Sequence, residues 1–223
     1  MDSGTLDNSS TGGMIGGMPD ASRDRRLPAL ALLWGIALVA SFAIAADRAT
    51  WLMEVAPLPL AFAALVAAQP HWRPSGLALG LIAVHGLVLA MGGAYTYAQV
   101  PAGFVVQDWL HLDRNPFDRL GHFLQGFVPA IVLREIVIGR GLIRRGGFCT
   151  AAILAFCLAI SAAYELIEFG AAKAMGQGAD AFLATQGDPW DTQWDMLTCL
   201  IGAAVALALL SRIDDRLIDA RRT

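Results

Sequence analysis

Six long apolar runs, separated by short polar segments, are the feature that most constrains this chain. They cover about residues 27–46, 51–68, 76–98, 120–138, 148–172 and 193–211. A helix of roughly 20 residues crosses a hydrocarbon layer of about 30 Å, and runs of these lengths can do so. Only 16% of the residues are charged, whereas soluble domains carry about 25%. The sequence therefore predicts an all-α, polytopic membrane helix bundle with about six transmembrane helices.

The second run is the weakest of the six, because it contains Glu54, Pro57 and Pro59. Proline is best tolerated in the first turn of a helix, where its missing N–H leaves no hydrogen bond unmade. We therefore expect an interfacial or irregular start to this run, followed by a short helix.

The ends of the chain are polar. Residues 1–22 are rich in Gly, Ser, Asp and Met without periodicity, which predicts a disordered tail. The membrane domain is expected to cover 23–212, followed by a short tail, 213–223. The first apolar run ends in small residues that a signal peptidase could also accept, so cleavage of residues 23–45 is an alternative.

Basic residues are distributed unevenly between the two sides of the predicted membrane. Of the sixteen, eleven lie in segments on the N-terminal side, four lie on the other side, and Arg134 lies within the fourth run. Lys and Arg are enriched in cytoplasmic segments. The sequence thus predicts a bacterial inner-membrane protein with both termini, and both tails, in the cytoplasm.

Several classes of function are excluded. A net charge of −3, with basic residues in short clusters, argues against nucleic acid as a partner and leaves the lipid bilayer as the implied one. The chain has no phosphate-binding loop, dinucleotide fingerprint or Gly-x-Ser-x-Gly motif. Cys149, Cys157 and Cys199 fall in apolar runs, where we expect the thiols to pack as small hydrophobes.

Two segments of similar design open the fourth and sixth helices. They read Asn-Pro-Phe-Asp at 115–118 and Asp-Pro-Trp-Asp at 188–191. Asn or Asp can accept from free backbone N–H groups, Pro fits the first helical position, and the second acid meets the positive end of the helix dipole. Helix capping alone therefore explains these residues.

Capping does not explain His122 and Asp195. Each follows the acid of its helix start by four residues, on the same face and one turn deeper. The fifth run approaches the same side of the membrane with Glu165 and Glu168, three residues apart on one face. The topology therefore predicts that all four side chains lie at a similar depth beneath the outer surface.

Ionisable side chains inside a membrane are costly, about 2.5–3.5 kcal/mol each, and usually mark a function. Bundle proteins hold divalent metals with carboxylates and imidazoles from facing helices. We hypothesise that these four residues are catalytic and that a divalent metal ion is bound by Asp118, His122, Glu165, Glu168, Asp191 and Asp195. The alternative is a set of salt bridges to Arg119 or Lys173.

Three further expectations concern residues elsewhere in the spans. His85 should be satisfied by one interhelical hydrogen bond, and Arg134 should extend to the membrane interface. Small residues let membrane helices approach closely, so Gly121, Gly126 and Gly202 should lie at helix contacts.

Five motifs resemble the YjdF family of predicted inner-membrane proteins. They lie at 92–98, 115–123, 134–135, 164–168 and 186–196. The resemblance spans about residues 30–212 and implies a membrane location. It implies no activity, because none is established for the family. A more distant similarity is to the VanZ-like membrane proteins linked with glycopeptide-antibiotic resistance. It is carried by Asp118, His122, Phe123, Tyr164, Glu165, Asp191, Asp195 and Gly202. Cys199 stands where the VanZ-like pattern has Asn.

Three classes of function remain. The first is a metal-assisted hydrolase or transferase acting on an envelope or lipid-linked substrate, in which Glu165 or His122 moves a proton. The second is an ion- or proton-coupled transporter, and the third is a non-catalytic membrane partner or regulatory subunit. A carrier should place polar groups at several depths. Here they gather near the outer end, with His85 as the main exception, which favours the enzyme.

The topology can be tested with reporter fusions or thiol labelling. Segments 99–117 and 174–190 should be accessible from outside, and segments 139–147 and 213–223 from the cytoplasm, because of the bias in basic residues. If segment 139–147 were labelled from outside, the polar helix ends would face the cytoplasm and the orientation would be wrong.

Overall fold

The structure is a computed structural model that describes residues 24–175 and 185–221. The predicted tail 1–22 lies outside these ranges. The helices are α1 (Arg26–Ile44), α2 (Arg48–Val55), α3 (Pro57–Ala68), α4 (Gly76–Ala94), α5 (Pro101–Leu110), α6 (Phe117–Gly139), α7 (Gly147–Met175) and α9 (Asp191–Asp219). Within the described ranges, six helical segments are long and apolar enough to cross a membrane, and α2 and α3 together form one of them. The prediction of an all-α bundle with six spans is confirmed.

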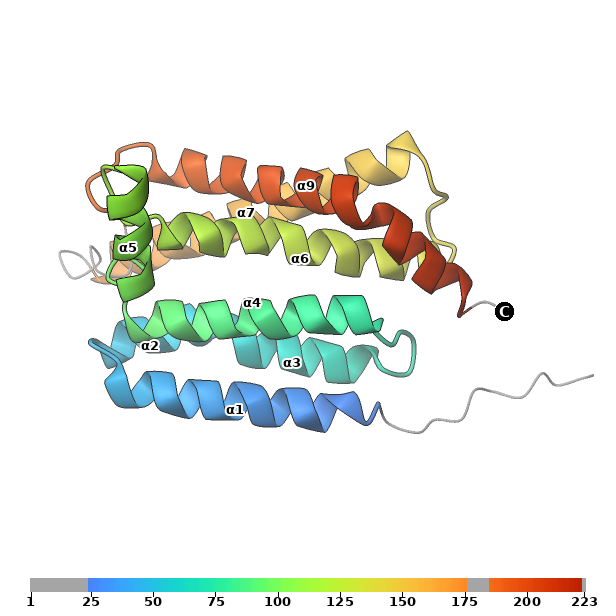
Figure 1. Ribbon diagram of the computed structural model, residues 1–223, viewed down its shortest axis with the longest axis horizontal. Helices are drawn as coiled ribbons and strands as arrows, with labels where there is room; N and C mark the ends of the chain where they lie inside the picture. The colour runs from blue at the N-terminus through green and yellow to red at the C-terminus, as the bar shows by residue number, and fades with distance from the viewer. Residues whose placement is uncertain (1–23, 176–184, 222–223) are drawn as a thin grey trace, which may run out of the picture.

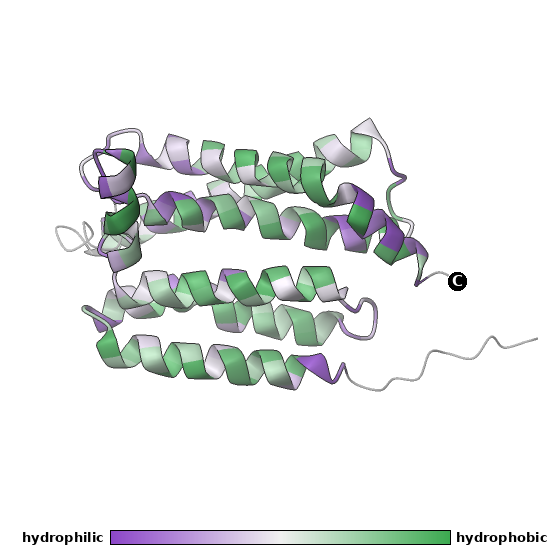
Figure 2. Ribbon diagram, viewed as in Figure 1, coloured by the Kyte–Doolittle hydropathy of each residue, from purple (hydrophilic) through white to green (hydrophobic). Residues whose placement is uncertain are grey.

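The bundle has two parts. Helices α1 to α4 form one part, in which α1 and α2 pack against α4, and helices α6, α7 and α9 form the other (Figure 1). The two parts meet where α4 packs against α6. Helix α5 lies across one end of the bundle, which we call the α5 end, and α9 finishes at the opposite, C-terminal end. Hydrophilic residues concentrate towards both ends (Figure 2), as expected for a bundle that crosses a bilayer.

The second span is two consecutive helices. Its start is a regular helix, so the expectation of an irregular segment was wrong. The Asp47 carboxylate accepts a hydrogen bond of 2.6 Å from the Thr50 N–H and caps α2. Pro57 then occupies the first turn of α3, as expected from its missing N–H. Glu54, which suggested an interfacial position, points into the bundle and is only 2% exposed.

Helices α6 and α9 contact each other backbone to backbone. A Cβ atom added at Gly126 would overlap the Cys199 carbonyl, and one at Gly202 would overlap the Phe123 carbonyl. The predicted role of these two glycines in close helix approach is confirmed. Gly121 instead makes room for a ring, because a Cβ atom there would lie 3.0 Å from Tyr97.

The core beside this contact is apolar. It includes Ile131 of α6, Cys157 of α7, and Cys199 and Ala203 of α9, all fully buried. The Cys157 thiol lies 3.7 Å from the Gly126 carbonyl, close enough for a weak hydrogen bond. All three cysteines are free and buried, as the sequence predicted.

The C-terminal end is held by buried ion pairs. Arg134 does not extend to the interface, because α9 continues past residue 211 and brings two carboxylates to it. Its guanidinium lies 2.5 Å from Asp214 and 2.7 Å from Asp215. The neighbouring Glu135 accepts a hydrogen bond of 3.0 Å from the N–H of Ser75, at the start of α4. These contacts join both parts of the bundle.

Replacing Gly202 by Leu should destabilise the protein by about 3 kcal/mol or more, since overpacking against a backbone carbonyl cannot be relieved by a rotamer change. Thermal unfolding in mild detergent measures the loss. Gly35→Leu is the matched control, because a Cβ atom at this helical glycine meets nothing within 4 Å. Equal stability of the two variants would contradict the close contact of α6 and α9.

Candidate metal and catalytic site

The two similar helix starts lie at the α5 end and are preceded by the same local turn. The Asn115 side chain accepts a hydrogen bond of 3.0 Å, and the Asp188 side chain one of 2.9 Å, from the backbone N–H two residues later. Helix α6 begins one residue after Pro116, and α9 begins two residues after Pro189. The prolines therefore precede the first turn instead of occupying it. The N-cap positions are Pro116 and Trp190, and neither makes a side-chain cap, so the predicted N-cap role of Asn115 and Asp188 was wrong. Their side chains instead close a turn just before each helix.

The four residues predicted to be catalytic come together beneath these helix starts. His122 Nε2 lies 3.7 Å from Asp118 Oδ1, 3.7 Å from Asp195 Oδ1 and 3.9 Å from Glu165 Oε1. Two groups of side chains offer ligand atoms that lie within 4.8 Å of one another. One group is Asp118, His122 and Asp195, and the other is His122, Glu165 and Glu168. His122 belongs to both groups, so three helices converge on its ring.

The His122 ring is oriented by its neighbours. Its Nδ1 lies 3.1 Å from the side-chain Oε1 of Gln125, and its ring packs edge-on against Tyr164, with centroids 6.3 Å apart. With the proton on Nδ1, donated to Gln125, the Nε2 lone pair faces the carboxylates. This is how metal-binding histidines are commonly fixed. His122 is buried, as are Asp118, Glu165 and Asp195.

Arg119 neutralises part of this negative charge. Its guanidinium makes an ion pair with Asp195 and lies 2.7 Å from Asp191 and 3.3 Å from Asp188. The salt-bridge alternative therefore holds for three of the six proposed ligands, which are Asp191, Asp195 and, at 3.9 Å, Asp118. Lys173, the other cation considered, instead lies over the Phe169 ring at 5.7 Å.

Asp191 is the proposed ligand that the structure separates from the rest. It also lies 2.5 Å from Arg114 and belongs to neither group of potential ligands around His122. In contrast, the Oε1 atom of Glu165 has no hydrogen-bond partner among the described residues, although the residue is only 7% exposed. A buried carboxylate oxygen without a partner costs free energy, so Glu165 is suited to a proton or a ligand.

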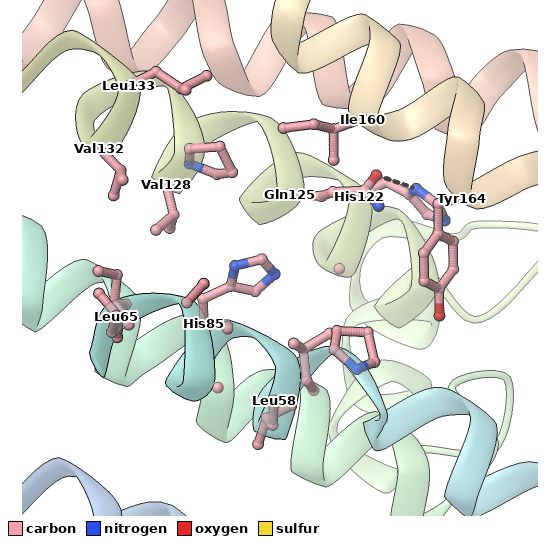
Figure 3. A pocket seen from close by; sticks show the side chains of 18 of the residues that line it. Leu58, Leu65, His85, His122, Gln125, Val128, Val132, Leu133, Ile160 and Tyr164 are labelled. Carbon is pink, nitrogen blue, oxygen red and sulfur yellow. Dashed lines mark hydrogen bonds between the residues drawn. The ribbon is translucent and has the colours of Figure 1, made fainter. Parts of the chain in front are cut away.

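A cavity of about 490 Å³ lies between α3 and α4 on one side and α6 and α7 on the other (Figure 3). Asp118, His122 and Glu168 line its polar end together with Glu54 of α2. Sequence reasoning missed Glu54, because the adjacent prolines suggested an interfacial segment. The signal that could have identified it was the position of an acidic residue within an otherwise apolar run, 51–68.

Two further side chains line the cavity. His85 does not make the expected interhelical hydrogen bond at Nε2, since this atom has no partner in the described part of the chain. Tyr97 reaches the cavity from a turn in which it and Thr96 adopt left-handed backbone conformations, with φ of 48° and 51°. Such strain is rare for residues other than glycine and concentrates at functional sites. Burial raises the pKa of Tyr97, so its hydroxyl keeps its proton.

These features define a polytopic helical membrane protein with a buried group of carboxylates and one imidazole at one end of the bundle. Residues 27–216 match the family described as "Predicted membrane protein (DUF2238)". The Inner membrane protein YjdF of Escherichia coli (strain K12) is 52% identical over 171 residues, which cover 76% of this chain and 81% of that protein. The chain belongs to this family and is a multi-pass inner-membrane protein. No solved structure matches it.

Arg119→Gln should destabilise the protein by about 3 kcal/mol, because it leaves Asp195 buried without its arginine and Asp191 with Arg114 alone. Chemical or thermal unfolding in detergent measures the change. Arg145→Gln is the control, since this exposed arginine pairs at the other end with Asp215 and Asp219, neither of which is buried, and Asp215 keeps Arg134 as a partner. The control should change stability by about 0.5 kcal/mol or less. A loss no larger for Arg119→Gln than for the control would show that the ion pairs do not hold the two helix starts together.

Proposed function

We propose that this protein is a metal-dependent membrane enzyme that hydrolyses, or transfers a group from, an envelope or lipid-linked substrate. The observation that carries the proposal is the position of His122 Nε2, which three carboxylates surround at 3.7–3.9 Å in a buried site. This site adjoins a cavity large enough for a small-molecule ligand. Buried carboxylates repel one another, so a divalent cation is a natural way to neutralise them.

The two groups of ligand atoms divide the work. Asp118, His122 and Asp195 hold the cation, because their atoms lie within 4.8 Å of one another and their oxygen and nitrogen donors suit Mg²⁺, Mn²⁺ or Zn²⁺. Arg119 keeps Asp195 in place through its ion pair. Glu168 lines the cavity and faces the substrate, and Glu165 lies beside it in the second group.

The reaction follows from this division. A divalent cation held by Asp118, His122 and Asp195 would act as a Lewis acid, polarising an oxygen of the substrate and lowering the pKa of a bound water. Glu165, whose Oε1 has no hydrogen-bond partner in the described residues, takes the proton of the attacking water or hydroxyl as a general base. The site lies at the end of the bundle that we predict to face outward, which is the side where envelope substrates are found.

Transport is the second candidate, and His85 is the observation that favours it. Its Nε2, which has no partner among residues 24–175 and 185–221, belongs to a side chain that lines the same cavity, farther along the bundle than His122. The lining beyond His85, towards Trp72 and Ile136, is largely apolar. An apolar path is unfavourable for an ion, so we rank the enzyme first. Metal uptake into liposomes that contain the purified protein would favour the carrier.

The metal site is tested by thermal stability. Addition of the correct divalent cation to the purified protein at about 100 times its Kd should stabilise it by about 2.7 kcal/mol, since the ligand binds only the folded state. His122→Ala and Asp195→Asn should each abolish the gain, and their effects should not add, because the ligands act as a unit. Asp219→Asn, the same change at the far end of α9, should retain it.

Catalysis is tested separately. The purified protein, incubated with an inner-membrane lipid extract, should release a new product in a metal-dependent manner, detected by mass spectrometry. Glu165→Gln should lose this product while it retains most of the metal-dependent stability. A parent protein that gains no stability from any divalent cation would refute the metal site. Product formation that is unchanged in Glu165→Gln would refute the role of the base.

A further inference from the structure

The cavity differs sharply between its two ends. At the α5 end it is lined by carboxylates, His122, Tyr97 and Tyr164. Along the rest of its length the lining is mainly aliphatic, with Leu65 of α3 and Val132, Leu133 and Ile136 of α6. Figure 3 shows Leu65 and Val132 on facing helices, away from His122 and Tyr164. A molecule that matches this cavity has a polar group at one end and an apolar chain behind it.

Glu54 shows independently that a ligand belongs at the polar end. It is 2% exposed, lines the cavity, and neither of its carboxylate oxygens has a hydrogen-bond partner in the described residues. It comes from α2, whereas the residues around His122 come from α6, α7 and α9. A buried carboxyl group is stable only when protonated, and then it is a donor, or when it faces a cation. An oxyanion accompanied by a divalent cation supplies a partner for either form.

The apolar part of the cavity is unsuited to water. Cavities lined by aliphatic side chains stay dry or take up apolar molecules, and this one lies at the depth of the lipid chains. Three small residues of α3, Ala61, Ala64 and Ala68, face it and leave room for a chain. A lipid chain gains little when it moves from the bilayer into an equally apolar cavity. The head group must therefore determine which molecule binds.

We propose that the cavity holds the apolar chain of an amphiphile whose oxyanion head group, a phosphate or a carboxylate, lies between Glu54 and the cation at His122. This names the substrate class of the proposed enzyme and rests on that proposal for the cation. The chain lies along α3 and α6, and the bond to be cleaved lies at the polar end, beside Glu165.

The test uses the purified protein in lipid nanodiscs and a long-chain alkyl phosphate with a photoreactive diazirine in its chain. After irradiation, mass spectrometry should locate cross-links on Leu65, Val132 and Leu133. The fatty acid with the same label distinguishes a carboxylate head group from a phosphate, and the corresponding alcohol has no oxyanion. Cross-linking of the alcohol equal to that of both anions would overturn the proposal, because the cavity would then accept any chain.

Two matched variants of α3 test the position of the chain. Ala64→Phe should lower cavity cross-links about tenfold, because the added ring occupies the space of the chain. Ala63→Phe adds the same ring at the next residue, which does not line the cavity, and should leave them unchanged. Equal cross-linking in the two variants would place the chain outside the cavity.

Glu54→Leu separates a binding role from a structural one. It removes a buried carboxyl group that has no partner in the part of the chain that the structure describes, so the protein should be as stable as the parent or more so, while cavity cross-links by the anionic probe are lost. Retained cross-links would remove Glu54 from the head-group site. A protein that cross-links in the cavity but gains no stability from metal would support the chain site and refute the metal site. Metal-dependent stability without cavity cross-links would refute the chain site alone.

Discussion

The contact between α6 and α9 is the interaction on which the rest of the structure depends. Without hydrophobic attraction between helices in lipid, close packing must supply the association. Here Gly126 and Gly202 bring each backbone against a carbonyl of the other helix. This contact fixes the depth of His122 relative to Asp195, and it aligns Arg119 with the acids at the start of α9. The same register brings Arg134 to Asp214 at the opposite end.

The two parts of the bundle are built differently. Helices α6, α7 and α9 enclose a tightly packed apolar core and carry most of the charged groups of the site. Where α3 and α4 face α6 and α7, the side chains leave a cavity. On α3 several of its lining residues are alanines, which fill little space. A rigid group of acids therefore adjoins a space that can admit a molecule, and binding sites commonly combine these two properties.

The sequence was informative where local chemistry determines position. Apolar run lengths predicted the spans, and spacing of four residues predicted that His122 and Asp195 follow their helix starts on one face. It was misleading where position depends on a distant partner. The sequence placed Arg134 at the interface because its carboxylate partners could not be foreseen. They lie on the extension of α9, about eighty residues later in the chain. Glu54 was missed because its exposure depends on how α2 packs against α4, which neither propensity nor periodicity encodes.

The ion pairs between α6 and α9 have a consequence for biogenesis. The chain is synthesised from its N-terminus, so the fourth span enters the membrane while the sixth has not yet left the ribosome. During this interval Arg134 and Arg119 have no carboxylates from α9, and unpaired charges at this depth are unfavourable. The insertion intermediate must keep these arginines near the lipid head groups or in the translocation channel. The fourth span therefore reaches its final depth only after α9 arrives, and assembly of the bundle is a late, post-insertion step.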